Sequence, residues 1–193
     1  MREEGNAGSK RRPGGIFILH EDRDILVVDK PAGLLTMGTE NNKQRTAYWM
    51  LTDYVRKGCA RSRNRVFIVH RLDRETSGVL LLAKTEDAKR TLQERWQDNE
   101  KKYLAVVHGR LARRADTITS YLAENRAYVV YSTPDPAKGK LARTAYTVLK
   151  ETGKYSLLDI TLLTGRKHQI RVHIADLGHP VVVDEKYGKE SDG

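Results

Sequence analysis

A dense charged stretch between two apolar runs constrains the fold of this chain more than any other feature. Residues 70–78 are mostly polar or charged, residues 66–69 form a short apolar run before them, and residues 79–83 are apolar at every position. An apolar run like the second is typical of a strand buried on both faces of a sheet. We therefore predict that a buried sheet carries a charged loop, whose groups must be paired with one another or used in chemistry. The residue pattern alone leaves both possibilities open.

The remaining pattern predicts an α+β fold. Glycine, proline and polar turn residues separate short β-rich runs from two stretches that read as helices. Strands are expected at 16–19, 25–28, 66–69, 79–83, 103–107, 142–150, 155–163 and 169–174, helices at 46–57 and 85–96, and a peripheral hairpin region at 116–140. Gly58 is placed to end the first helix. We expect one mixed, mostly antiparallel β-sheet with flanking helices, carrying the functional site in a basic cleft.

The length of 193 residues fits one domain, because two domains would each be small. We expect residues 16–193 to form a single catalytic domain. Residues 1–15 are polar, glycine-rich and basic, so they are predicted to be a flexible N-terminal arm. They lack the apolar core of a secretory signal, and no apolar stretch approaches the roughly 20 residues of a membrane-spanning helix. The single cysteine rules out an internal disulfide and argues against a zinc site. These features predict a soluble cytoplasmic protein.

The charge balance points to a polyanionic partner. The net charge is +10 and the isoelectric point is about 9.7. Lysines and arginines that neutralise phosphates release counterions, so nucleic acid is the natural partner. A basic but unspecialised surface explains the charge equally well.

The charged stretch reads His-Arg-Leu-Asp-Arg-Glu-Thr-Ser-Gly, and three more segments, 28–34, 102–109 and 164–173, each contain a glycine and at least one lysine or arginine. The charged stretch resembles the signature of RluA-like pseudouridine synthases, His-Arg-Leu-Asp-x-x-Thr-Ser-Gly, and matches every specified position. The other three resemble further motifs of that family in the expected order, so the similarity spans roughly residues 16–188. The resemblance implies an RNA-modifying isomerase that converts uridine in structured rRNA or tRNA to pseudouridine and needs no cofactor.

The resemblance also implies a three-residue catalytic site. Asp73 matches the family's essential aspartate, which provides a carboxylate beside the sugar of the target uridine. That carboxylate attacks the sugar carbon, attacks the base or removes a sugar proton, and the sequence leaves all three roles open. Arg171 matches an arginine that pairs with this aspartate and keeps it ionised. Its alternative role is a phosphate contact. Tyr103 matches a tyrosine that stacks on the target base and whose hydroxyl could assist removal of the C5 proton. Its alternative role is core packing.

Candidate RNA contacts come from the same motifs. Arg71 matches a position associated with filling the space that an extruded base leaves, and a phosphate contact is its alternative. Further RNA-facing candidates are Lys30, Lys102, Arg166 and Lys167, together with Arg61, Arg63 and Arg65. His168 and His173 lie five residues apart on a predicted strand, so they should face opposite sides and hold no metal.

Two departures from the family bear on how the chain selects RNA. Many relatives carry an N-terminal RNA-binding domain of the S4 type, whereas only about 15 residues precede the first predicted strand, so no S4 domain is expected. Relatives also continue past residues 184–188 with another strand, so this chain is either a short member or truncated. We expect a monomer.

Two rival functions are considered. An inactive RNA-binding module of the same fold would explain the basic charge, but joint retention of Asp73, Tyr103 and Arg171 argues against it. A nucleoside or glycoside hydrolase would need Asp73 and a second carboxylate such as Glu75. Those two residues have no guaranteed geometry on a loop, and the charge suits a polyanion better than a neutral sugar.

Overall fold

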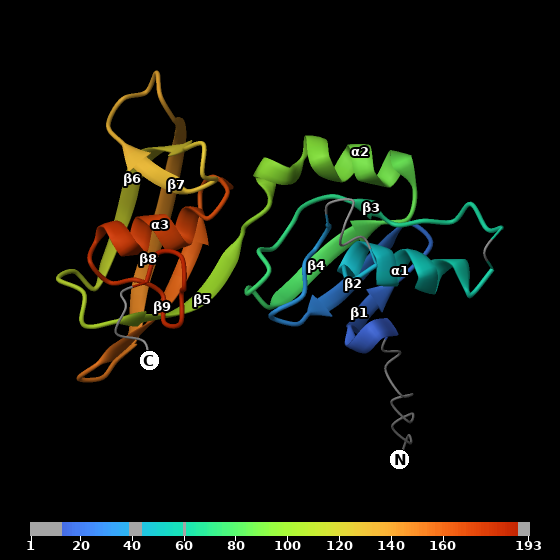
Figure 1. The fold of residues 1–193 in the computed structure, drawn as a ribbon, viewed down its shortest axis with the longest axis horizontal. Helices are drawn as coiled ribbons and strands as arrows, with labels where there is room; N and C mark the ends of the chain where they lie inside the picture. Colours follow the sequence, from blue (N-terminus) through green and yellow to red (C-terminus); the bar gives the residue numbers. More distant parts are fainter. Residues whose placement is uncertain (1–12, 39–43, 60, 189–193) are drawn as a thin grey trace, which may run out of the picture. The chain divides into compact units, whose positions relative to one another are not determined.

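The chain divides into two compact units, residues 1–96 and residues 97–193, which we call the N-terminal and C-terminal units. The computed structural model describes residues 13–38, 44–59 and 61–188. Each unit has its own antiparallel sheet and at least one α-helix (Figure 1). The predicted α+β class is confirmed, although the described strands form two sheets where one was expected.

The domain organisation predicted from the sequence is not decided by this division. The single catalytic domain over residues 16–193 stays a prediction. Residues 1–12 of the predicted arm lie outside the described residues.

The N-terminal sheet has the strand order β1-β2-β4-β3, and each neighbouring pair is antiparallel. Its strands are β1 (Phe17–Glu21), β2 (Ile25–Lys30), β3 (Phe67–Ile68) and β4 (Gly78–Ala83). β1 and β2 form the predicted hairpin. Leu26 of β2 lies opposite Leu82 of β4, and both are fully buried. Val28 lies opposite Leu80 in the same way, so cross-strand apolar pairs form the centre of this sheet.

The two predicted helices of the N-terminal unit begin within one residue of their predicted starts, and a 3-10 helix lies at the end of the predicted flexible arm. Its helical elements are η1 (Pro13–Gly15), α1 (Ala47–Arg56), α2 (Glu86–Glu94) and η3 (Trp96–Asp98), the last of which extends past residue 96. The hydroxyl of Thr46 accepts a hydrogen bond from the Trp49 N–H at the start of α1 (3.2 Å), and Thr85 caps α2 in the same way. α1 ends at Lys57, which has a left-handed backbone (φ 52°), directly before Gly58.

One prediction for this unit was wrong. β4 was expected to be buried on both faces, but Val79 is 61% exposed, whereas Leu80 and Leu82 are fully buried. The strand is antiparallel to both neighbours, so its side chains alternate between the core and the other face of the sheet.

The C-terminal sheet has the strand order β5-β9-β8-β6-β7, again antiparallel throughout. Its strands are β5 (Lys102–His108), β6 (Ala115–Glu124), β7 (Val130–Thr133), β8 (Lys140–Glu151) and β9 (Tyr155–Leu162). The hairpin region predicted at 116–140 is therefore only partly peripheral, because β7 is an edge strand but β6 pairs on both sides.

The last predicted strand, at 169–174, is instead helix α3 (Gln169–Asp176). Alternating Ile170, Val172 and Ile174 suggested a strand. In the structure Val172 and Ile174 pack into the sheet's apolar core, while Gln169 and His173, one helical turn apart, are buried as well. The buried face of α3 therefore carries two polar residues, which hides its helical period.

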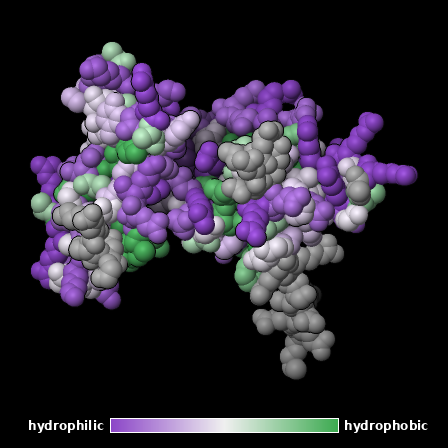
Figure 2. Space-filling model, in the orientation of Figure 1, coloured by the Kyte–Doolittle hydropathy of each residue, from purple (hydrophilic) through white to green (hydrophobic). Residues whose placement is uncertain are grey.

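Hydrophilic side chains cover most of the visible surface of both units, with small hydrophobic areas among them (Figure 2). Within the part of the chain that the structure describes, no helix is long and apolar enough to cross a membrane.

Candidate functional site

Asp73 lies in the loop that joins β3 to β4, next to a residue that is anchored in the core. The Leu72 N–H donates to the Thr36 hydroxyl (3.2 Å), and that hydroxyl donates to the Leu72 carbonyl (2.7 Å). Leu72 is 6% exposed and Thr36 is 2% exposed. The Thr76 N–H closes a turn by donating to the Asp73 carbonyl (3.2 Å). The half-buried carboxylate therefore follows a fixed backbone, which limits the positions it can occupy.

Lys30 is hydrogen-bonded to the same loop from the interior of the unit. Its buried ammonium donates to the carbonyls of Pro31 (2.8 Å), Leu34 (2.7 Å) and Arg74 (3.2 Å). Burial lowers the pKa of Lys30 from its ordinary value, whereas the carboxylates of Glu75 and Asp73 act in the opposite direction. Because the side chain is 0% exposed and its three N–H groups are used, the prediction that Lys30 contacts RNA was wrong. It joins the loop after β2 to the Asp73 loop.

His70 was assigned no role of its own from the sequence, yet it fixes the start of the loop. Its Nε2 accepts a hydrogen bond from the Leu81 N–H (3.0 Å), so the proton of the neutral ring is on Nδ1. The ring stacks on Trp96 with 4.4 Å between centroids. Burial lowers the pKa of His70 to about 4. The imidazole is therefore uncharged at neutral pH.

Arg71 is exposed on the same loop. It makes no hydrogen bond or ion pair with another residue that the structure describes. An exposed guanidinium next to the anchored Leu72 suits a contact with RNA, so its predicted role stays open to test.

Arg171 lies on α3 in the C-terminal unit and is held by Asp184. Its Nε and Nη2 each donate to one carboxylate oxygen at 2.6 Å, and the guanidinium lies over the Tyr187 ring at 5.0 Å. The N–H groups of Lys186 and Tyr187 donate to the same carboxylate (3.0 Å each). These two bonds to Asp184 use two of the five N–H donors of the guanidinium and orient it.

Asp184 is a functional candidate that sequence reasoning missed. It is 8% exposed. Burial raises its pKa, but the bonds from Arg171 and from the backbone of Tyr187 and Lys186 outweigh this effect, so the pKa lies below its ordinary value. The available signal was an aspartate that directly follows three valines and lies three residues before Tyr187.

Tyr103 lies on β5 opposite Ile160 of β9. It is half-buried and packs against the core that contains Leu158 and Ile160. Packing of this kind is compatible with both of its predicted roles, base stacking and core packing.

The remaining basic candidates of the C-terminal unit, Lys102, Arg166 and Lys167, are exposed and contact neighbours within that unit. Lys102 lies 3.3 Å from Glu100, and the Arg166 Nε donates to the Leu141 carbonyl at 3.0 Å. Lys167 pairs with Glu124 and lies 5.7 Å from the Tyr128 ring centroid. None is buried, so each stays a candidate RNA contact.

The two histidines near Arg171 do not lie on a strand, so the premise of their predicted opposite orientation was wrong. His168 precedes α3 with a left-handed backbone (φ 53°), and its Nδ1 bonds the Tyr187 hydroxyl (2.8 Å). His173 is fully buried, with its ring nitrogens bonded to the hydroxyls of Thr144 and Ser120 (2.9 Å each). Among the described residues no group of three or more His, Cys, Asp or Glu side chains could hold a metal ion.

The predicted catalytic residues are thus distributed over both units. Asp73 and Arg71 belong to the N-terminal unit, and Tyr103 and Arg171 belong to the C-terminal unit. Within the units the structure brings Lys30 beneath the Asp73 loop and Asp184 to Arg171. The three-residue catalytic site and the basic cleft stay predictions.

A family model described as RNA pseudouridylate synthase matches residues 24–176, which is more than half of the chain. The chain belongs to the RNA pseudouridylate synthase family. This membership confirms the RluA-like resemblance that the four motifs predicted. The part matched by the RNA pseudouridylate synthase model includes Asp73, Tyr103 and Arg171.

Members of the RNA pseudouridylate synthase family resemble this chain over most of its length. An uncharacterized RNA pseudouridine synthase of Mycoplasma pneumoniae is 40% identical over 179 residues, which cover 91% of this chain and 56% of that protein. The ribosomal large subunit pseudouridine synthase C of Buchnera aphidicola is 38% identical over 177 residues, covering 89% and 54%. The solved structure of human RNA pseudouridylate synthase domain containing 4 has a TM-score of 0.76 at 27% identity and covers 91% of this chain and 70% of that chain. The chain spans a little more than half the length of the curated relatives it matches.

Proposed function

We propose that this protein is an RNA pseudouridine synthase in which Asp73 is the catalytic residue. The observation that carries the proposal is the Asp73 loop, which matches the family signature and is braced by buried hydrogen bonds from Thr36 and Lys30. A carboxylate on a fixed backbone is what a reaction at a single sugar carbon requires. The substrate is a uridine in structured rRNA or tRNA. The name of the Buchnera relative favours large-subunit rRNA.

The reaction requires contributions from four residues of the chain. The bond from N1 to the sugar breaks, the base turns, a bond from C5 to the sugar forms, and the C5 proton leaves while N1 takes up a proton. Asp73 provides the carboxylate beside the sugar, and Arg171 keeps that carboxylate ionised. Tyr103 stacks on the base and assists removal of the C5 proton. The uridine must leave its stack before it reaches Asp73, and Arg71 fills the space it leaves.

We also propose the partner, the cofactor requirement, the location and the oligomeric state for this reaction. RNA of the translation machinery is the partner, no cofactor takes part, and the protein acts as a cytoplasmic monomer. The charge of +10 supports RNA binding through phosphate neutralisation.

Substitution of Asp73 tests the assignment. In Asp73→Asn we expect formation of pseudouridine to fall by at least about 100-fold, because a positioned acid or base contributes roughly that much or more. RNA from cells that lack the gene serves as substrate, and pseudouridine is quantified by mass spectrometry of the digested RNA. RNA affinity should stay within about twofold of the unsubstituted protein.

Asp29→Asn is the matched control, because Asp29 is an exposed aspartate on β2 of the same unit. Equal activity of the two variants would refute the role of Asp73. An unsubstituted protein that binds RNA and leaves every uridine unchanged would instead indicate the inactive binding module, and release of free base would indicate a hydrolase.

A further inference from the structure

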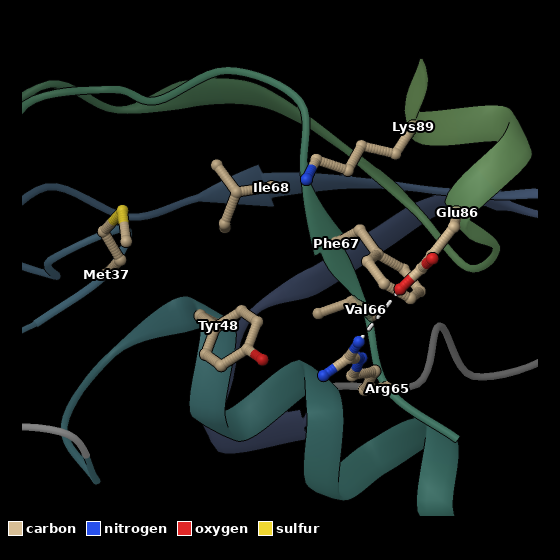
Figure 3. A pocket seen from close by; sticks show the side chains of 8 residues that line it. All are labelled: Met37, Tyr48, Arg65, Val66, Phe67, Ile68, Glu86 and Lys89. Atoms are coloured by element: carbon tan, nitrogen blue, oxygen red, sulfur yellow. Dashed lines mark hydrogen bonds and ion pairs between the residues drawn. The ribbon is translucent and has the colours of Figure 1, made fainter. Parts of the chain in front are cut away.

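A pocket of about 310 Å³ opens on the N-terminal unit among α1, the β3 segment and α2. Figure 3 shows the side chains that line it, and they come from all three elements. The apolar lining consists of the rings of Tyr48 and Phe67 with Met37, Val66 and Ile68. Met37 is 46% exposed. An open pocket with two aromatic rings in its wall offers faces on which a flat, apolar group can stack.

Cations border the aromatic wall. The Arg65 guanidinium lies 4.8 Å from the centroid of the Phe67 ring, and its Nη2 lies 3.1 Å from the Glu86 carboxylate. The Glu86 carboxylate pairs with this guanidinium, and both side chains are more than half exposed. Lys89 reaches the same pocket from the next turn of α2. The pocket therefore combines stacking surface with positive charge.

Arg65 also lines a second, more polar pocket of about 670 Å³. Its other cationic lining residues are Arg23, Lys57 and Lys84. Lys84 is paired with Glu21 at 2.9 Å. The side chains of Arg23 and Lys57 form no hydrogen bond or ion pair with the residues that the structure describes. An aromatic pocket and a cationic pocket thus adjoin at one guanidinium.

We propose that these adjoining pockets bind one unpaired nucleotide of the substrate RNA, separate from the target uridine. The base stacks on Phe67 and Tyr48, and its phosphate binds Arg65 and the cations of the second pocket. A volume of about 310 Å³ is at the lower end of the range of roughly 300–1,000 Å³ for ligand pockets. Single-stranded RNA is favoured over a duplex, because only an unstacked base can enter the aromatic pocket. The site would select substrates with an unpaired nucleotide near the target.

The inference rests on the proposed function only for RNA as the partner, and it is tested by binding alone. The probes are a fluorescent octamer of uridine and a fluorescent RNA duplex of twelve base pairs. We expect Phe67→Leu to weaken binding of the octamer by about fivefold or more, since one stacked base contributes at least that much. Binding of the duplex should change by less than about twofold. Leucine keeps the half-buried position apolar, so the fold is retained.

A second variant separates stacking from charge. Lys89→Gln should reduce the slope of log affinity against log salt for the octamer by about 0.7, whereas Phe67→Leu should leave that slope unchanged. Lys150→Gln and Tyr131→Leu are the controls, because both residues are exposed on the C-terminal unit and outside these pockets. Neither control should change binding by more than about twofold.

The outcomes also separate this inference from the proposed function. The nucleotide site would be overturned if neither variant changed binding of the octamer, or if octamer and duplex lost affinity equally. Losses of the same size in the control variants would also overturn it. If Phe67→Leu fails to fold, the salt slope of Lys89→Gln decides alone. Selective losses in a protein that forms no pseudouridine would support the nucleotide site and count against the proposed function.

Discussion

At the scale of single residues, buried hydrogen bonds determine the structure around the Asp73 loop. His70 can accept from the Leu81 N–H only as a neutral ring, and the ring stacks on Trp96. Lys30 is the opposite case, a charge kept in the interior because three carbonyls solvate it. Both residues hold the backbone around Asp73, so their roles are positional.

His70 predicts an acid-sensitive N-terminal unit. Its folded-state pKa of about 4 lies below the ordinary value of about 6.5, so protonation favours the unfolded chain. The stabilisation is complete above about pH 6.5 and is lost as pH falls toward 4. The loss of unfolding free energy is at most about 2 kcal/mol by pH 5. The measurement is urea unfolding at pH 7 and pH 5, followed by fluorescence of Trp49 and Trp96, which both lie in this unit.

The control for this prediction is His70→Phe, which retains a ring against Trp96 and removes the titration. We expect it to be less stable than the unsubstituted protein at pH 7, because the Leu81 N–H loses its acceptor. The unfolding free energy of His70→Phe should fall less between pH 7 and pH 5 than that of the unsubstituted protein, by up to about 2 kcal/mol. An identical pH dependence in both proteins would show that His70 is not the titrating group.

Asp184 is predicted to be a positioning residue for Arg171. In Asp184→Asn one charge-assisted bond to the guanidinium is lost, and such bonds contribute about 1.5–3 kcal/mol. If Arg171 orients Asp73, kcat for pseudouridine formation should fall by about 10-fold or more, while KM for RNA changes little. Single-turnover and steady-state kinetics separate the two constants.

Glu185→Gln is the control, because Glu185 is the exposed neighbour of Asp184. The thermal midpoint of each variant must be measured with its kinetics. A lower midpoint for Asp184→Asn with unchanged kcat at a temperature where it is folded would limit Asp184 to a structural role.

At the scale of elements, α3 depends on polar contacts in the interior of its unit. Gln169 donates to the Thr144 hydroxyl (2.9 Å), and the His173 Nδ1 bonds the same hydroxyl (2.9 Å). The other ring nitrogen of His173 continues the network to Ser120 and from there to Ser132. One threonine of β8 therefore serves two buried residues of α3.

Removal of that hydroxyl should destabilise the C-terminal unit. Thr144→Val keeps the shape of the side chain but leaves Gln169 and His173 short of a partner, at a cost of about 1–3 kcal/mol. Thr147→Val is the matched control, because Thr147 is an exposed threonine on the same strand. The measurement is chemical unfolding followed by far-ultraviolet circular dichroism. A control variant that is destabilised as much as Thr144→Val would contradict the role of the network.

Elements were predictable where local chemistry decides them. Helices α1 and α2 begin directly after Thr46 and Thr85, which cap them, and the β1-β2 hairpin follows from two apolar runs and a polar turn. α3 was not predictable in this way, because Gln169 and His173 are buried against the hydroxyls of Thr144 and Ser120, which lie more than 20 residues away in sequence. A polar pair on the core side removes the apolar period by which a helix is recognised.

At the scale of the whole molecule, two compact units divide the predicted site residues between them. Each unit contributes a different chemistry, because the N-terminal unit carries the aspartate loop and the C-terminal unit carries the arginine with its carboxylate partner. The net charge of +10 belongs to the entire chain and suits an RNA partner.

The sequence by itself determined the family and placed Asp73 in the signature motif. An ordered set of motifs is a local property of the chain and can be read without tertiary contacts. It also determined the hairpin and the helix caps, which depend on neighbours within a few residues. Only the tertiary structure decided that Lys30 is buried, that Arg171 is clamped by Asp184, and that residues 169–176 form a helix. These depend on partners from other elements, and burial turns a residue that would be solvated in isolation into one that must be hydrogen-bonded.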